Sequence, residues 1–187
     1  MSRYVNQRAF TLIELLTVLS LVAIASMLAM PAWSFLVERS ERSTVTGGLI
    51  SAFNLARTTA INARSTVTVC PLDDDQECVD DWSLPVTIFL DPDRSRSRSP
   101  EETVVRLLAP PKRGTLLVQS SSRPYFGFIP NGMASSAIGN IRWCPRDNNP
   151  RHAIQLRINR GGRVMTAQDR DGDDIVEGSD GNPISCS

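Results

Sequence analysis

The amino-terminal part of the chain is almost free of charge, and this feature constrains the fold more than any other. The 29 residues from Ala9 to Val37 contain one ionisable side chain, that of Glu14. About 20 helical residues at roughly 1.5 Å each span a bilayer core of about 30 Å. We therefore expect a membrane-spanning helix over residues 10–37.

The charges that flank this segment predict its orientation. Arg3 and Arg8 precede it, whereas the two acids and two arginines of residues 38–42 cancel. The positive-inside rule then places the amino terminus in the cytoplasm and the rest of the chain outside. A secretory signal peptide is the alternative, but it would have a shorter apolar core followed by a small-residue cleavage site. We interpret the segment as a retained single-pass helix of a bacterial inner membrane.

Residues 9–16, Ala-Phe-Thr-Leu-Ile-Glu-Leu-Leu, with the apolar run to Pro31, resemble the amino terminus of type IV pilins and type II secretion pseudopilins. The resemblance implies that a prepilin peptidase removes residues 1–9 by cutting between Ala9 and Phe10, and that Phe10 is then N-methylated. The family usually has Gly before the cut, where this chain has Ala9. The resemblance also implies that the helix is kinked or loosened at Pro31, because proline removes a helical hydrogen bond.

Glu14 is the one acid inside the apolar run. A carboxylate within a bilayer is costly unless it is paired, so its default interpretation is functional. The resemblance implies that it meets the terminal amine of a neighbouring subunit during assembly. The alternative is a carboxylate solvated at the headgroup boundary.

The helical pattern continues past the apolar run. One stripe at helical spacing is formed by Leu49, Phe53, Ala56 and Ala60. We predict one helix over about residues 11–63, loosened near Pro31 and near the Gly47-Gly48 pair. Residues 38–64 are its amphipathic continuation.

From residue 66 the pattern changes to that of β-strands. Strands are predicted at residues 66–70, 86–90, 103–108, 115–119, 125–128, 141–144, 153–158 and 163–166. Asn131-Gly132 and Gly161-Gly162 are turn signals, and the second predicts a hairpin. The fold class is α+β: a long helix packed on an antiparallel β-sheet domain over residues 65–187, which the predicted orientation places in the periplasm.

The later half resembles the H-type subfamily of minor pilins and pseudopilins, the FimU-, FimT- and GspH-like proteins. The resemblance rests on residues 126–132, Phe-Gly-Phe-Ile-Pro-Asn-Gly, and on Gly162-Arg163-Val164. It implies a non-catalytic minor pilin that primes assembly or forms the tip of a type IV pilus at the cell surface. Its partners would be other major and minor pilins or pseudopilins, the prepilin peptidase and the inner-membrane assembly platform. The alternative is the H-type pseudopilin of a type II secretion system.

The four cysteines allow three pairings. An even number of cysteines beyond a membrane segment suggests disulfides, and we favour Cys70–Cys78 and Cys144–Cys186 over free buried thiols. His152 lies eight residues after Cys144, but a bridged Cys144 cannot serve as a nucleophile. We expect no catalytic residue, no metal and no cofactor.

The stretch from Arg106 to Arg163 is basic, because it contains ten lysine or arginine residues and one acid. Such a stretch can attract nucleic-acid phosphates, and FimT-like proteins bind DNA through a Gly-Arg-x-Arg motif. Here that motif would begin at Gly162 and lacks its second arginine. DNA binding through Arg160 and Arg163 is therefore a second alternative, less favoured than solvated arginines.

Acidic residues gather at Asp169, Asp171, Asp173 and Asp174, around Gly172. Clustered carboxylates suit Ca²⁺, but the glycine does not stand where an EF-hand loop needs it. We favour a solvated turn, and the sequence leaves calcium open.

Overall fold

The structure is a computed structural model that describes residues 11–121, 123–135 and 138–186, apart from the side chains of 28–36 and 38. The chain divides into two compact units, Met1–Glu38 and Arg39–Ser187. Within the described residues, no helix combines the length and apolar character needed to cross a membrane. The predicted membrane segment, residues 10–37, lies partly outside the described residues.

One helix, α1, runs from Leu12 to Ala63. Thr11 caps its amino end, because its side-chain Oγ1 accepts a hydrogen bond from the backbone N–H of Glu14 at 3.3 Å. At the other end the chain leaves the helix through Arg64, which has a positive φ of 50°. The helix therefore has the extent that the sequence predicts, to within a residue at its start.

The expected loosening at the Gly47-Gly48 pair is wrong, since α1 is continuous there. A side chain added at Gly48 would meet only Leu108 at an ordinary 3.7 Å, so the backbone packs against the sheet at this point. The neighbours Val45, Leu49 and Ile50 all pack in the main core. Packing of these side chains supplies more stability than the two glycines remove.

Eight strands follow within the described residues, each close to its predicted position. The first sheet has the order β3-β2-β1-β5 and holds β1 (Val67–Pro71), β2 (Val86–Leu90), β3 (Val104–Leu108) and β5 (Phe126–Phe128). The second sheet has the order β4-β6-β7-β8 and holds β4 (Thr115–Gln119), β6 (Gly139–Cys144), β7 (Ile154–Ile158) and β8 (Val164–Thr166).

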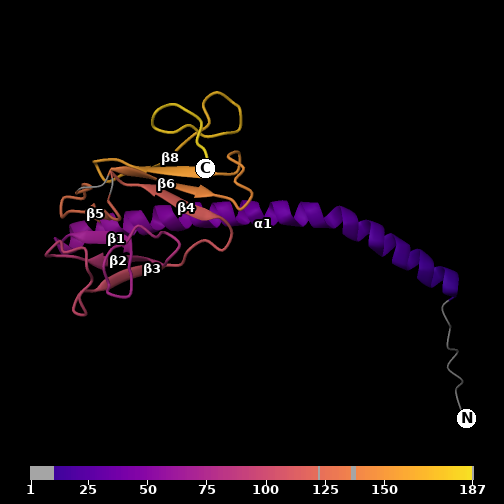
Figure 1. Ribbon diagram of the computed structural model, residues 1–187, viewed down its shortest axis with the longest axis horizontal. Helices are drawn as coiled ribbons and strands as arrows, with labels where there is room; N and C mark the ends of the chain where they lie inside the picture. The colour runs from indigo at the N-terminus through magenta and orange to yellow at the C-terminus, as the bar shows by residue number, and fades with distance from the viewer. Residues whose placement is uncertain (1–10, 122, 136–137, 187) are drawn as a thin grey trace, which may run out of the picture. The chain divides into compact units, whose positions relative to one another are not determined.

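All of the strand pairings are antiparallel, and β7 and β8 form the predicted hairpin. The sequence predicted one antiparallel sheet domain, and the structure divides it into two sheets (Figure 1). The fold is α+β, as expected.

The core of the second unit lies where the later half of α1 meets both sheets (Figure 1). The helix contributes its predicted stripe together with Ala52, and these five side chains are at most 1% exposed. The ring of Phe53 packs edge-on against Phe126 and Phe128 of β5, with centroids 5.2 and 6.2 Å apart. The second sheet adds Ile141 and Leu156, among others, to the same cluster. Both sheets are therefore held by one helical face.

Candidate functional site

The first part of α1 exposes an apolar surface that the described chain does not cover. Ten large apolar side chains on this part are more than half exposed: Leu12, Ile13, Leu15, Leu16, Val18, Leu19, Leu21, Val22, Ile24 and Met27. They occupy every side of the helix, which is a pattern found when lipid or other helices surround it. This surface is a candidate site for contact with a membrane or with partner helices.

The hydroxyl groups on the same part of α1 are satisfied within the helix. Thr17, Ser20 and Ser26 each donate a hydrogen bond to a backbone carbonyl three or four residues earlier, at 2.9, 2.7 and 2.8 Å. Such bonds remove the need for water at these hydroxyls. The segment is thus compatible with an apolar environment in spite of its three hydroxyl side chains.

Glu14 stands in the first turn of α1 and is exposed. Thr11 and Glu14 have the spacing of a capping box, in which the acid reaches back toward the capping residue. The acid also lies where the partial positive charge of the helix end is concentrated. Glu14 therefore stands where an acid favours the start of a helix, which the sequence analysis missed although the Thr-x-x-Glu spacing signals it.

The predicted processing positions, Ala9 and Phe10, lie outside the described residues. The backbone of α1 is helical at Pro31, and its side chain is outside the described residues. Cleavage, methylation and the kink accordingly remain predictions.

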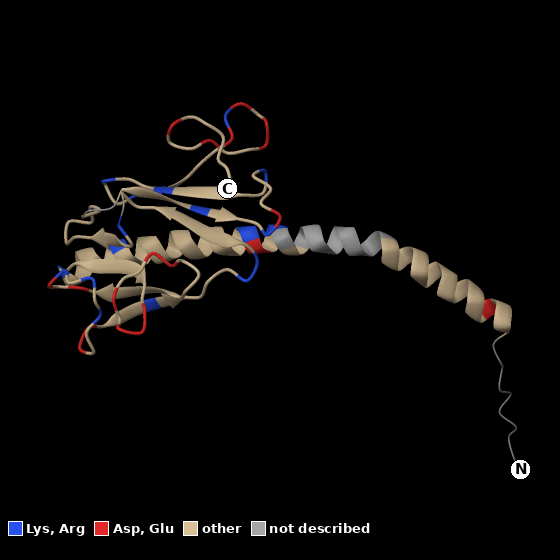
Figure 2. Cartoon of the chain, viewed as in Figure 1, with Lys and Arg blue, Asp and Glu red and all other residues tan. Residues whose placement is uncertain are grey.

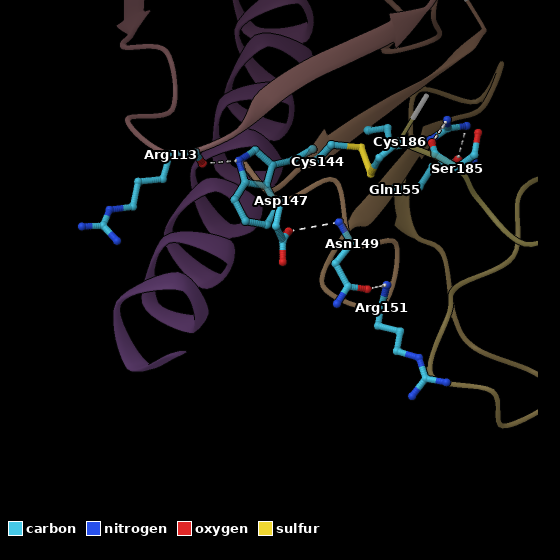
Figure 3. Close-up of a disulfide and its surroundings, with 10 residues drawn as sticks. Arg113, Cys144, Asp147, Asn149, Arg151, Gln155, Ser185 and Cys186 are labelled. Atoms are coloured by element: carbon cyan, nitrogen blue, oxygen red, sulfur yellow. Dashed lines mark hydrogen bonds between the residues drawn. A yellow bond between two sulfur atoms is a disulfide. The ribbon is translucent and has the colours of Figure 1, made fainter. Parts of the chain in front are cut away.

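The carboxyl-terminal tail is tied to the second sheet by a disulfide between Cys144 of β6 and Cys186 (Figure 3). The guanidinium of Arg142 donates hydrogen bonds to the backbone oxygen of Ser185 and, at 3.4 Å, to Gln155. Burial lowers the pKa of Arg142. The side chain of Ile184 is only 4% exposed and packs with Ala153 and Cys144. The tail is an ordered part of the domain surface.

The second disulfide joins Cys70 of β1 to Cys78. These two pairs are the ones that the sequence analysis favoured, and the structure has no free cysteine within the described residues. Because Cys144 is bridged, its sulfur is not available to His152 as a thiolate. The pairing removes the one catalytic arrangement that the sequence made conceivable.

Two turns that carry the resemblance to minor pilins meet beside α1. Gly132 follows β5, and Gly162 lies in the β7–β8 turn; their φ angles are +77° and +72°. A side chain on Gly162 would overlap the carbonyl oxygen of Gly132. That same oxygen accepts a hydrogen bond from Nε of Arg57 on α1 at 3.0 Å. The Gly-Arg-Val motif therefore includes a glycine that packing requires.

Arg160 and Arg163, the candidate DNA contacts, are both exposed at this turn. The backbone oxygen of Arg160 accepts a hydrogen bond from Ala134, and the backbone N–H of Arg163 donates one to the side chain of Asn159. Their backbones are fixed by the turn, and their guanidinium groups are displayed at the surface. Figure 2 shows that the basic residues are scattered over the second unit, whereas most of its acidic residues lie in loops.

Comparisons with known proteins agree with this architecture. Residues 46–162 match the family model described as type II transport protein GspH. Residues 5–30 match the prokaryotic N-terminal methylation motif. No curated protein sequence matches the chain significantly.

Three solved structures are similar to this chain. The type IV minor pilin FimU from Pseudomonas aeruginosa strain PAO1 is 21% identical, with a TM-score of 0.57 over 81% of this chain and 99% of FimU. A second crystal form of FimU gives 19% identity and a TM-score of 0.51, over 79% and 98% of the two chains. The minor pseudopilin EpsH from the type 2 secretion system of Vibrio cholerae is 12% identical, with a TM-score of 0.44 over 67% and 95%.

The GspH model spans more than half of the chain, and the methylation motif covers the apolar start of α1. The fold, a helix packed on antiparallel sheets, is that of type IV pilins. The chain belongs to the GspH family and is a non-catalytic minor pilin or pseudopilin.

Proposed function

We propose that the chain is a minor pilin of a type IV pilus that primes assembly or forms part of the tip complex. The observation that carries the proposal is the uncovered apolar surface of α1 between Leu12 and Met27. Subunits held in a membrane and then packed into a filament need a helix that is apolar on every side, first for lipid and then for neighbouring helices. The likeness of the fold to FimU supports the choice of pilus.

Processing and location follow from the same proposal. The leader of residues 1–9 is cut from Phe10 by the prepilin peptidase, and the match to the methylation motif supports this step. The mature helix then anchors the chain in the inner membrane with the sheet domain in the periplasm. Glu14 attracts the terminal amine of the next subunit, and Pro31 lets the helix bend in the filament.

A pseudopilin of a type II secretion system is the second candidate. The description of the matched family, type II transport protein, favours it. A deletion strain separates the two candidates, because a type IV pilus and a type II secretion system serve different functions that can be measured separately. Loss of surface pili and of twitching motility with normal secretion supports the pilus. Loss of exoprotein secretion with normal pili supports the pseudopilus, and re-expression of the full chain is the control.

DNA uptake is the third candidate, and the exposed Arg160 and Arg163 at one turn are the feature that favours it. Binding through arginine and phosphate weakens steeply as the salt concentration rises. A mobility-shift titration of the full chain in detergent at two salt concentrations tests it, with the double variant Arg160→Ala, Arg163→Ala as the matched control. We expect that near physiological salt the double variant shifts DNA as much as the unchanged chain does. A shift that the double variant abolishes would support DNA uptake.

A further inference from the structure

Four carboxylates of the carboxyl-terminal segment converge on one point. They belong to Asp169, Asp171, Asp173 and Glu177, and one ligand atom from each lies within 4.8 Å of all the others. Like charges at such distances repel one another unless something neutralises them. The one ion pair of this loop among the described residues, Arg151 with Asp174 at 3.6 Å, uses an acid outside the four. Within the described residues, none of the four carboxylates forms an ion pair.

Glu177 is the member of the cluster that a solvated turn does not explain. Its side chain is only 5% exposed. One oxygen, Oε2, accepts a hydrogen bond from the backbone N–H of Arg170 at 2.9 Å. The other oxygen, Oε1, is buried and has no hydrogen-bond partner among the described residues. A buried carboxylate oxygen without a partner is costly, and a bound cation would remove that cost.

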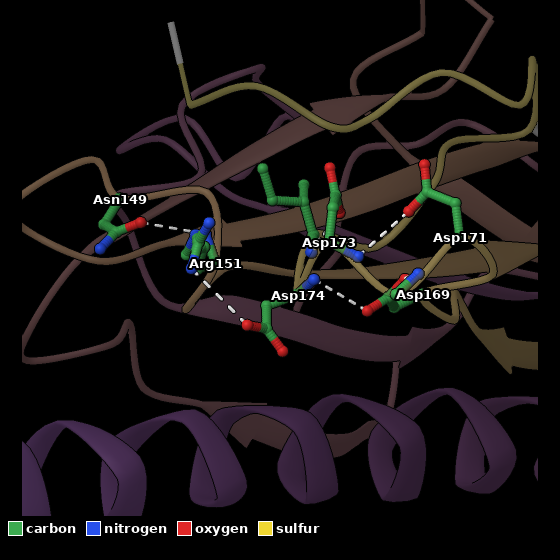
Figure 4. A network of polar contacts seen from close by, with 8 residues as sticks. Asn149, Arg151, Asp169, Asp171, Asp173 and Asp174 are labelled. Carbon is green, nitrogen blue, oxygen red and sulfur yellow. Dashed lines mark hydrogen bonds and ion pairs between the residues drawn. The ribbon is translucent and has the colours of Figure 1, made fainter.

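The loop holds the other three carboxylates in place. Asp169 accepts hydrogen bonds from the backbone N–H groups of Gly172 and Asp174 at 2.7 and 2.9 Å. Asp171 accepts one from Asp173, and Asp173 accepts one from Ile175 (Figure 4). Gly172 and Asp174 adopt positive φ angles of 85° and 68°, which curl the backbone around the acids. The carboxylates are therefore fixed by the backbone rather than free to spread apart.

We propose that this loop, residues 169–177, is a Ca²⁺ site. Ca²⁺ takes six to eight oxygen ligands at about 2.3–2.6 Å, so ligands on opposite sides of the ion lie roughly 4.8 Å apart. The four oxygens fit within that span. Mg²⁺ binds at about 2.0–2.1 Å and requires a tighter octahedron. Zinc, copper, iron and nickel prefer sites with nitrogen or sulfur ligands, and this cluster offers oxygen alone.

A bound ion would also help to order the carboxyl-terminal tail, because the loop directly precedes that tail in the chain. Ile175 and Val176, inside the loop, pack against the buried cluster of Cys144, Ala153 and Ile184, as Cys186 also does. The backbone of Ile184 also donates a hydrogen bond to Val176. The ion and the Cys144–Cys186 disulfide thus hold the same segment at two points, and removal of the ion should loosen the surface between them.

Calorimetric titration of the full chain in detergent with CaCl₂, after treatment with a chelator, tests the proposal. We expect binding with a Kd of about 0.1–1 mM, the range of extracellular calcium modules, and at least tenfold weaker binding of MgCl₂. Calcium should also raise the melting temperature by several degrees and slow protease cleavage after residue 169. No heat and no shift at about 10 mM CaCl₂, or equal affinity for MgCl₂, would overturn the assignment.

Three variants locate the site. Asp171→Asn keeps an oxygen for its backbone hydrogen bond and removes the charge, so it should weaken calcium binding at least tenfold with an unchanged melting temperature in chelator. Glu177→Gln should weaken it similarly. Asp93→Asn is the matched control, because Asp93 belongs to a separate acidic cluster with Asp91 and Glu102. Binding that survives Asp171→Asn, or that Asp93→Asn abolishes, would contradict the proposed site.

Discussion

Gly162 lies so close to the carbonyl oxygen of Gly132 that a Cβ atom on Gly162 would overlap it. The contact joins the β7–β8 turn to the turn after β5, and Arg57 of α1 donates a hydrogen bond to the same oxygen. One point thus connects the first sheet, the second sheet and the helix. It explains in physical terms why this chain carries glycine at both turns.

Gly162→Ala should destabilise the domain by at least about 2 kcal/mol. The substitution combines a positive φ, which costs about 1–2 kcal/mol for a residue with a Cβ, with the overlap on Gly132. Gly181→Ala is the matched control, since Gly181 also has a positive φ, of 82°, but nothing within 4 Å. It should cost about 1 kcal/mol. Chemical denaturation of the two variants measures the difference, and equal losses would show that the contact with Gly132 is unimportant.

Glu14→Gln separates the two roles of this acid. Glutamine can serve in a capping box as glutamate does, so the helix start should be preserved, but the charge that attracts a neighbouring amine is lost. We expect normal membrane insertion and at least a tenfold reduction in filament incorporation, measured by immunoblots of membranes and sheared filaments. Thr11→Ser, which keeps the cap, is the control. Incorporation of Glu14→Gln at the wild-type level would leave only the capping role.

Cys186→Ser should release the tail. The bridge to Cys144 spans 42 residues, and loop-closure estimates give about 4 kcal/mol for such a loop. The melting temperature of the chain should fall by about 10 °C, and proteases should cut after residue 169. Cys78→Ser opens a span of only 8 residues and should cost about 2.5 kcal/mol while the tail stays protected. Peptide mapping without reduction checks both bonds, and a tail that resists proteases in Cys186→Ser would contradict the role of this bridge.

The sequence predicts local structure better than it predicts pairing. The strands were placed to within a few residues because β-branched runs and turn residues act locally. The division into two sheets was missed because it depends on distant partners, such as Thr68 of β1 with Gly127 of β5. Nothing in either strand alone specifies that register.

The acidic loop shows the same limit at a candidate site. From the sequence, Asp169, Asp171 and Asp173 indicated a turn with an open question about calcium. Glu177 was not considered with them, because it is only 5% exposed in the folded chain, where it pairs with Pro183 in an isolated β-bridge. The pairing of Cys144 with Cys186 brings the tail to the sheet. Burial of a charged group is a property of the fold, and periodicity does not reveal it.

Mass spectrometry of sheared and purified type IV pili tests the central claim most directly. The account predicts that peptides of this chain occur in the pili at a low ratio to the major subunit, and that the first peptide begins at N-methylated Phe10. A strain without the prepilin peptidase should leave the chain in the membrane with residues 1–9 attached. Absence of the chain from pili, together with its recovery in the filament of a type II secretion system, would contradict the account.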